Sequence, residues 1–471
     1  MAIAAKIFST LGNSQSLVPL AVKDCANGAG MTAASSVTSK DEGRDRFIDE
    51  FGSEAIWLGG IPTFKKAIDK TLFKAAGLDP NYDVRNLKDK DIFEKTKKYA
   101  PNDKIKSNIE KIGQNQRTFK NLNIAKFSLA TLMTLGTYNV MTDLKQKYTH
   151  NRIKSKLLKQ SQENVKAMND KFLASDSVKA GMNSNFKSLE KIRTGAVDNK
   201  NGQEGQPNFK GLYNVMLDPV KNTMVLDGGI TTERLAKSRS PQELAGYAIK
   251  EGGFLFFMYV LGQKIQSHLE KSADKKHNKN ISLDARVLEN DSLKQAFADK
   301  SIEKSLNDFE KFTNPNAKDA DLYEFLHNYP DNMVVDAAKQ SDIIKTYKKP
   351  KKWYQIFKKS EDTGIIDSRK YINMDSVKNT YKNMSKLYNQ YKTSGETADK
   401  FFNGVRKLKR GSIMKNIGST IFALGVFLPG VMLADRFLKP DNKEFAVEKE
   451  IKAQLQKKIK SCRLMTNTYG A

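Results

Sequence analysis

Residues 416–434 read NIGSTIFALGVFLPGVMLA, a run of nineteen residues without a charged side chain. A helix needs about 20 apolar residues to cross a bilayer, so this run is long enough to span one. Pro429 does not exclude a span, because spanning helices tolerate proline. The run predicts either a transmembrane helix or the buried centre of a helical hub. Basic residues stand just before it, namely Arg406, Lys407, Lys409, Arg410 and Lys415.

Three shorter apolar runs lie at residues 55–61, 127–141 and 252–262. Hydrophobic residues make up only 39% of the chain and charged residues 28%, so long solvated helices fit better than a compact globular enzyme. The predicted fold is mainly α. Four apolar helices form a membrane or buried hub, and long charged amphipathic helices and one small β-hairpin complete it.

The formal net charge of +27 favours anionic partners, either lipid headgroups or nucleic acid. Most of the basic residues are lysines, whereas base-specific recognition favours arginine, so sequence-specific nucleic-acid binding is disfavoured. A lysine-rich composition also arises in proteins from AT-rich genomes. The two cysteines, Cys25 and Cys462, lie near opposite ends of the chain and indicate a reducing compartment rather than a disulfide framework.

Capping and turn signals divide the chain into segments. Ser39 and Glu42 form a capping box that starts helix A, and Ser240, Pro241 and Glu243 start helix A′. The expected segments are an extended or disordered lead at 1–38, helices A and B with charged arms at 39–175, a loop and small hairpin at 176–239, helix A′ at 240–272, a soluble amphipathic helical region at 273–405, helix B′ at 406–438 and a charged tail at 439–471.

Finer features are expected within these segments. Helix A should break near Gly59, Gly60 and Pro62. Helix B should run from Asp103 to about Ser175, as one helix or two nearly collinear ones. Residues 213–217 and 223–226, around a turn at Asp218 and Pro219, predict the two strands of the hairpin.

The order A, B, A′, B′ suggests an internal duplication. Helix B aligns with B′ without gaps, which places Lys126 opposite Lys415 and Gly136 opposite Gly425, and A aligns with A′ in the same way. A duplicated two-helix unit predicts that both glycines face a neighbouring helix closely. The alternative is that amphipathic helices of biased composition resemble one another by chance.

Helix A′ carries Lys250 and Glu251 between two apolar stretches, and Glu50 holds the matching place in helix A. At the middle of a spanning helix each charge would cost roughly 2.5–3.5 kcal/mol, so A′ alone is a poor span. Glu50, Lys250 and Glu251 are therefore candidate buried charges. They indicate either a helix packed inside a bundle or a functional charged site within the membrane.

Residues 348–359 read KKPKKWYQIFKK and interleave basic with aromatic side chains. Such a segment suits a membrane interface, where rings lie at headgroup depth and lysines meet anionic lipid. The alternative is a charged loop whose aromatic rings pack onto a helix. The candidate lipid contacts are Lys351, Lys352, Trp353, Tyr354, Phe357, Lys358 and Lys359.

No nucleotide-binding loop, catalytic motif or metal-ligand spacing occurs, so no catalytic, cofactor or metal residue is assigned and no enzyme is expected. We expect a membrane-anchored structural or interaction protein in the cytoplasmic membrane of a prokaryote, with anionic lipid as its partner and a protein as a further candidate partner. The alternatives are a small-solute transporter or channel built on a duplicated helix pair, and a soluble basic scaffold that binds nucleic acid nonspecifically. No cofactor and no oligomeric state follow from the sequence.

Overall fold

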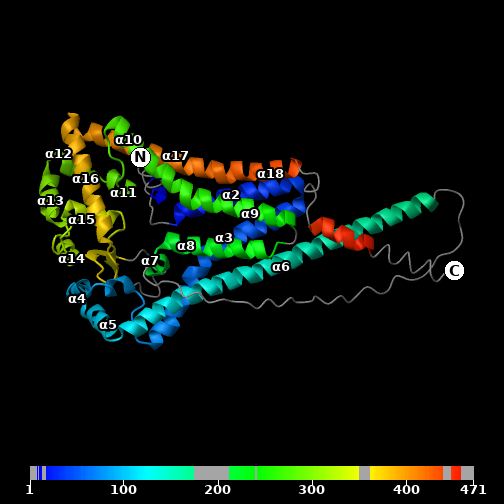
Figure 1. Ribbon diagram of the computed structural model, residues 1–471, viewed down its shortest axis with the longest axis horizontal. Helices are drawn as coiled ribbons and strands as arrows, with labels where there is room; N and C mark the ends of the chain where they lie inside the picture. The colour runs from blue at the N-terminus through cyan, green and yellow to red at the C-terminus, as the bar shows by residue number, and fades with distance from the viewer. Residues whose placement is uncertain are drawn as a thin grey trace.

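The computed structural model describes residues 8, 10–12, 17–173, 212–238, 241–349, 361–438 and 447–457. It is 83% helical and 2% strand, which confirms the mainly α fold. Figure 1 shows an elongated bundle of helices with a group of shorter helices at one end, and α6 extending past the other end.

The bundle is built from long helices that are continued or joined by short π-helical turns. Turn η1 (Asp69–Phe73) continues α3, η3 (Phe256–Leu261) joins α9 to α10, and η5 (Ala423–Phe427) joins α17 to α18. The helices are α2 (Val18–Thr38), α3 (Lys40–Ile68), α6 (Gln116–Leu173), α8 (Pro219–Ala236), α9 (Pro241–Leu255), α10 (Gly262–His277), α17 (Ala398–Phe422) and α18 (Leu428–Leu438).

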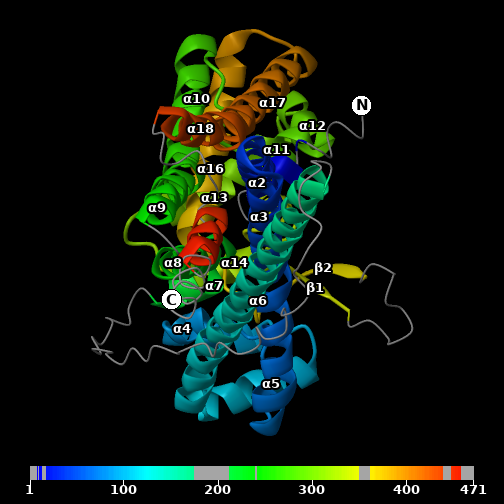
Figure 2. The same ribbon diagram turned by 90° about the vertical axis from the view of Figure 1, so that its right-hand side faces the viewer.

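Side-chain pairs fix the relative directions of these helices. Asp41 at the start of α3 pairs with Arg152 of α6, whereas Asp69 after α3 pairs with Lys126 near the start of α6. The two helices are therefore antiparallel along most of the bundle. Figure 2 shows α6 crossing the front of α3 in the view down the length of the bundle.

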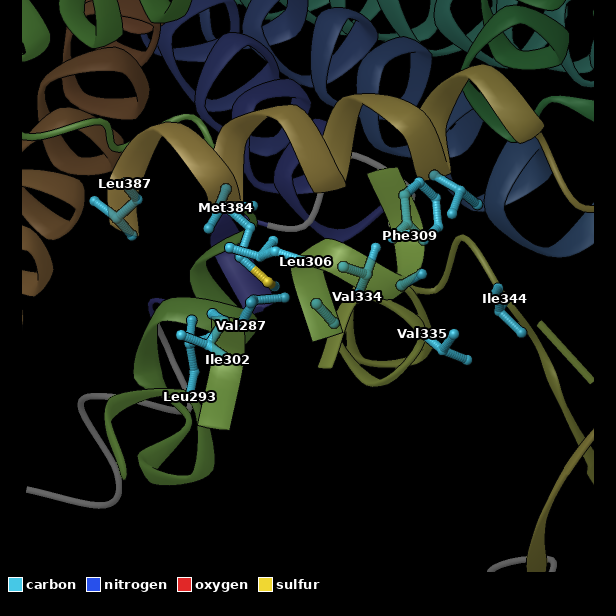
Figure 3. Packing of buried hydrophobic residues seen from close by; sticks show 14 of the residues in the cluster. Val287, Leu293, Ile302, Leu306, Phe309, Val334, Val335, Ile344, Met384 and Leu387 are labelled. Atoms are coloured by element: carbon cyan, nitrogen blue, oxygen red, sulfur yellow. The ribbon is translucent and has the colours of Figure 1, made fainter. Parts of the chain in front are cut away.

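The group of shorter helices, which we call the end domain, packs against α10 and the first part of α17. It contains α11 (Ala285–Glu289), α12 (Asp291–Ala298), α13 (Ser301–Glu310), the 3-10 turn η4 (Lys311–Thr313), α14 (Asp319–Asn328), α15 (Met333–Gln340) and α16 (Met374–Ser394). Its core is conventional, with apolar side chains inside. Figure 3 shows Leu306, Val334 and Met384 gathered beneath α16.

A second small core lies beside the end domain. Helices α4 (Lys90–Lys98) and α5 (Asp103–Gln114), with the 3-10 turn η2 (Val84–Leu87), enclose Phe73 and Phe119 together with three isoleucines of α5. Strands β1 (Thr346–Lys348) and β2 (Asp362–Ile366) pair antiparallel. The chain therefore has one small antiparallel strand pair within its described residues, but it lies more than a hundred residues further along the sequence than residues 213–226, where the hairpin was predicted.

Residues 213–226 are helical because their turn residues start a helix. They form α7 (Leu212–Leu217) and the first half of α8. The Asp218 side chain accepts hydrogen bonds from the backbone N–H groups of Val220 and Lys221, and Pro219 occupies the first turn. Aspartate as cap followed by proline is a strong helix start, so the predicted hairpin at this place was wrong.

The expected extended lead at 1–38 is also wrong for residues 18–38, which form α2. This helix is rich in small residues, and it packs on α3 and on η5. A Cβ atom at Gly30 would lie 2.2 Å from the carbonyl oxygen of Gly425, so the two backbones approach very closely. Close packing outweighs the low helix propensity of the glycine, serine and threonine residues here, and the alanines favour the helix.

Helix A also differs from expectation, and helix B is divided into two helices, as one of its two expected alternatives allowed. No break occurs at Gly59, Gly60 or Pro62, because α3 continues through them and Gly60 packs against Thr134 of α6. Helix B is interrupted at Asn115, which divides it into α5 and α6. Within the expected tail, residues 447–457 are helical.

The two aligned glycines occupy different environments. A Cβ atom at Gly425 would lie 3.0 Å from the carbonyl oxygen of Ala26, whereas one at Gly136 would meet nothing within 4 Å. Gly425 therefore faces α2 closely, but Gly136 points away from its neighbours. The prediction that both glycines pack tightly was wrong for Gly136.

Candidate functional site

Helix α6 has the reverse of the polarity that a water-soluble helix shows. Its buried positions recur at helical spacing and are mostly polar: Ala130, Thr134, Tyr138, Thr142, Lys145 and Thr149. Its exposed positions between residues 127 and 144 include large apolar side chains, namely Leu129, Leu132, Met133, Val140 and Leu144, beside the uncharged polar residues Ser128, Thr137 and Asn139 and one charged residue, Asp143. A surface helix of a soluble domain buries its apolar face instead.

Helix α3 has the same reversed polarity. Between Phe47 and Phe64 every charged side chain is buried, namely Asp49, Glu50 and Glu54. Phe47 and Leu58 of the same stretch are exposed. The acidic residues of this stretch therefore point into the bundle, while Phe47 and Leu58 point outward.

Helix A′ (α9 with η3) and helix B′ (α17, η5 and α18) also expose apolar side chains and no charged ones over their apolar stretches. Lys250 and Glu251 are the charged residues of stretch 244–261, and both are buried, while Leu244, Ile249, Phe256 and Val260 are exposed. The stretch 416–434 has no charge and exposes Phe422, Val426, Phe427 and Val431.

We call the outer faces of 47–64, 127–142, 244–261 and 416–434 the apolar belt. Contacts between the helices place these stretches at the same level along the long axis of the bundle. Gly52 lies against Met141, Gly253 lies against Leu428, and Glu50 pairs with Lys250.

Inside the belt, the described helices hold a network of ion pairs with Arg234 of α8 near its centre. One guanidinium nitrogen of Arg234 lies 2.6 Å from Glu251, and its Nε lies 3.3 Å from Asp49. Its Nε also donates to the Tyr138 hydroxyl at 2.8 Å, and a further nitrogen donates to Ser53 at 3.1 Å. Arg234 thus connects α3, α6, α8 and α9.

Lys250 extends the network on the α9 side. Its ammonium group lies 2.5 Å from Glu50 and 2.8 Å from Glu251, and its side chain is 1% exposed. Arg46 lies 3.7 Å from Glu50, and its guanidinium group stands 5.0 Å from the centre of the Tyr247 ring. The three candidate residues Glu50, Lys250 and Glu251 therefore lie together, although they come from two helices distant in sequence.

Lys145 extends the network on the α6 side. Its ammonium group lies 3.2 Å from Asp49 and 3.7 Å from Asp45. Asp45 also accepts a hydrogen bond from Thr149 at 2.7 Å. The ion-paired side chains of the whole network comprise equal numbers of acids and bases: Asp45, Asp49, Glu50 and Glu251 with Arg46, Lys145, Arg234 and Lys250.

Two further carboxyl groups lie at the edge of the network. Asp24 of α2 accepts a hydrogen bond from the Trp57 indole at 3.1 Å, and Asp227 of α8 accepts one from the Tyr259 hydroxyl at 2.5 Å. Both line a cavity of about 20 Å³, together with Glu50 and Glu251. A cavity of that size can hold one water molecule.

Beyond the belt, basic side chains of α6 are exposed, among them Arg152 and Lys156. Asp41 at the first turn of α3 pairs with Arg152 at 3.1 Å and Lys156 at 2.8 Å. Burial alone would raise the pKa of Asp41, but the hydrogen bonds from Lys156 and Arg152 lower it below its ordinary value. This carboxylate therefore stays charged at the end of the bundle.

The residues that complete the network were missed in the sequence. Arg234 lies in the segment that was taken for a loop and hairpin, and Lys145 follows the apolar run of helix B. The polar spacing of Thr134, Tyr138 and Thr142 was a usable signal for an inward polar face, because these residues recur every fourth position. No local pattern predicts that Arg234 meets Glu251 and Asp49.

The candidate lipid contacts from Lys351 to Lys359 lie outside the described residues, so their role stays a prediction. Within the described part of the chain, no group of three or more His, Cys, Asp or Glu side chains is placed to hold a metal ion. Cys25 donates a hydrogen bond from its thiol to Glu54 at 2.9 Å.

Comparison of this chain with known protein families, curated proteins and solved structures gives no match. The function therefore has to be argued from the residues and their arrangement.

Proposed function

We propose that this protein is an integral membrane protein, whose bundle lies in the bilayer and holds the end domain at one membrane surface as a structural or interaction module. The reversed polarity of α6 carries this proposal. A helix that buries threonine, tyrosine and lysine while exposing leucine, methionine and valine is stable where the surrounding solvent is hydrocarbon.

Two helices support the proposal by their length. Glu243–His277 and Ala398–Asp435 are long and apolar enough to cross a membrane, and only 33% and 28% of their most apolar stretches are buried inside the protein. The core helix of a soluble protein would be mostly buried instead. At 1.5 Å per residue, the nineteen residues 416–434 extend about 28 Å, close to the roughly 30 Å hydrocarbon thickness.

The ion-pair network fits the same setting. Charges in a hydrocarbon layer are tolerated when they face the bundle interior and pair with one another. Here the ion-paired acids and bases are balanced in number, and most pairs join two helices. In this proposal the ion pairs stabilise the association of α3, α6, α8 and α9. Apolar side chains contribute little to that association, because they pack about equally well against lipid.

Extraction from membranes tests the proposal. After cell fractionation, the protein should stay in the membrane pellet through high-salt and alkaline carbonate washes and be released by detergent. Release by salt would indicate electrostatic attachment through the lysines, and recovery in the soluble fraction would contradict the proposal. A soluble nucleic-acid-binding scaffold would instead lose its ligand steeply as salt is raised.

A small-solute transporter is the second candidate, and the buried network favours it. Intramembrane ionisable groups often mark ion pathways, and here they adjoin a water-sized cavity between Asp24 and Asp227. The buried face of α6 also supplies a polar stripe, formed by Thr134, Tyr138 and Thr142.

Flux measurements separate the two candidates. In proteoliposomes, a transporter should lose substrate-driven flux in Glu251→Gln while the amount of folded protein is unchanged, and Glu233→Gln on α8 is a matched control outside the network. A purely structural network predicts that Glu251→Gln lowers stability and that neither protein carries a flux.

A further inference from the structure

A large cavity lies where the bundle meets the end domain. Its volume is about 570 Å³, which is within the range of small-molecule sites. Its walls come from α2, α10 and α17 on the bundle side and from the ends of α11, α15 and α16 on the other. Gln263, Ser267 and Asn379 on its rim are exposed, so the cavity opens to the surface.

Lys23 of α2 lines this cavity and lacks a counter-charge. Its side chain is 92% buried, and its ammonium nitrogen would lie 3.4 Å from a Cβ atom placed at Gly262. Within the described ranges, no carboxylate or other acceptor pairs with it. The other charged groups of the cavity are paired, Lys409 with Glu270 at 3.0 Å and Asp284 with Arg286 at 3.0 Å.

Most of Lys23 is removed from water and its ammonium group faces the cavity, a position that costs stability unless an anion compensates the charge. The electrostatic potential in the cavity is therefore positive beside the ammonium group of Lys23. The sequence before α2, residues 1–16, contains no acidic residue that could supply a partner.

Amide and hydroxyl side chains line the same cavity as this lysine. The side-chain oxygen of Asn416 is buried and has no hydrogen-bond partner among the described residues, although its nitrogen donates to Gln266 at 3.2 Å. Asn416 and Gln266 both line the cavity, as do Gln263 and Ser267. The lining thus offers one unpaired cation, one unused acceptor and several polar groups that fix orientation.

We propose that this cavity binds a small polar anion, whose carboxylate or phosphate group pairs with Lys23 and whose body donates a hydrogen bond to Asn416. The site does not depend on whether the bundle crosses a bilayer, because it lies at the junction with the end domain. The anion can be a free solute or the headgroup of an anionic lipid, since both present the same group to Lys23.

Thermal unfolding of the purified full chain tests this site. Inorganic phosphate and succinate serve as soluble probes against chloride at equal ionic strength, and phosphatidylglycerol is compared with phosphatidylcholine in nanodiscs. Lys23→Met removes the cation, and Lys264→Met removes an exposed lysine from α10 with the same change in net charge.

The wild type and Lys264→Met should be stabilised in a saturable way by at least one probe, because a ligand that binds only the folded state raises the unfolding temperature. Lys23→Met should bind that probe about tenfold or more weakly, given the strength of hydrogen bonds to charged groups. Without any probe, Lys23→Met should unfold at a higher temperature than the wild type, because it no longer buries an unpaired charge.

A response to phosphate or succinate identifies a free solute, and a Lys23-dependent response to phosphatidylglycerol alone identifies a lipid headgroup. The proposal is overturned if no probe stabilises the wild type, or if Lys23→Met responds to every probe as the wild type does. A lower unfolding temperature of Lys23→Met without probe also contradicts it, since that result assigns Lys23 a structural partner.

Discussion

The ammonium group of Lys250 lies 2.5 Å from the carboxylate of Glu50, and both side chains are buried. This pair joins α9 to α3 at the height of the apolar belt. Neither charge could be buried there alone, because an isolated ion in an apolar interior costs several kcal/mol. The pair therefore explains how helices with charges in their middle can belong to an apolar bundle.

Replacing Lys250 with methionine should destabilise the protein by about 3 kcal/mol, because it leaves Glu50 and Glu251 with fewer counter-charges. The loss should lie at the lower end of the range for broken buried pairs, since Arg234 still contacts both acids. Unfolding of the purified variant in detergent measures it.

The double variant Glu50→Gln with Lys250→Met provides the control for that measurement. The two losses should not add, and the coupling should be about 0.5–3 kcal/mol, because the second change removes a charge that the first left unpaired. Additive losses would show that the two side chains do not interact in the folded protein.

Gly30→Ala should destabilise the bundle by about 1–3 kcal/mol, because the added methyl group meets the carbonyl oxygen of Gly425. Gly430→Ala on α18 is the matched control. Its Cβ would meet nothing within 4 Å, so helix propensity should make it neutral or stabilising by up to about 1 kcal/mol. Equal effects of the two changes on the unfolding temperature would rule out close contact between α2 and η5.

His327 of α14 should make the end domain less stable in acid. Burial lowers the pKa of His327 to about 4, although its hydrogen bond to the Tyr323 carbonyl opposes this effect. Its Nδ1–H group donates to that carbonyl at 2.9 Å, and its Nε2 is buried with no partner among the described residues. Protonation would therefore bury an N–H group without an acceptor.

Because the folded pKa lies below the unfolded value of about 6.5, the unfolded chain binds the extra proton first. Stability is complete above pH 6.5 and falls by about 3 kcal/mol as the pH drops to 4. Unfolding curves of the wild type and His327→Gln across this range check the effect. If the stability of His327→Gln falls with decreasing pH as steeply as that of the wild type, other groups cause the acid sensitivity.

The sequence predicted the helical class and the apolar runs, because these depend on composition and spacing. It did not predict which face of each helix is buried. Periodicity shows that α6 has two faces, but whether Thr134, Tyr138 and Thr142 point inward depends on whether the surroundings are water or hydrocarbon. The three candidate buried charges could be named because charged residues inside apolar runs are conspicuous.

The other members of the network could not be predicted from the sequence, and the reasons are physical. Arg234 reaches Asp49 through tertiary packing of α8 on α3, and no local pattern encodes that contact. Asp218 and Pro219 were taken as a turn because the same residues favour turns and helix starts. The small residues of α2 suggested an extended lead, whereas their small size is what permits the close contact with η5.

The most direct test of the membrane-embedded bundle compares two exposed residues on one continuous helix. Val426 lies in the middle of stretch 416–434 and is 58% exposed, while Met414 precedes the stretch and is 52% exposed. Each is replaced by lysine, and membrane integration is measured by carbonate-resistant recovery. In a bilayer, Val426→Lys should cost about 2.5–3.5 kcal/mol and reduce integration strongly, whereas Met414→Lys should have little effect. If the protein is soluble, both changes should be nearly neutral, and equal integration of the two variants would contradict the account.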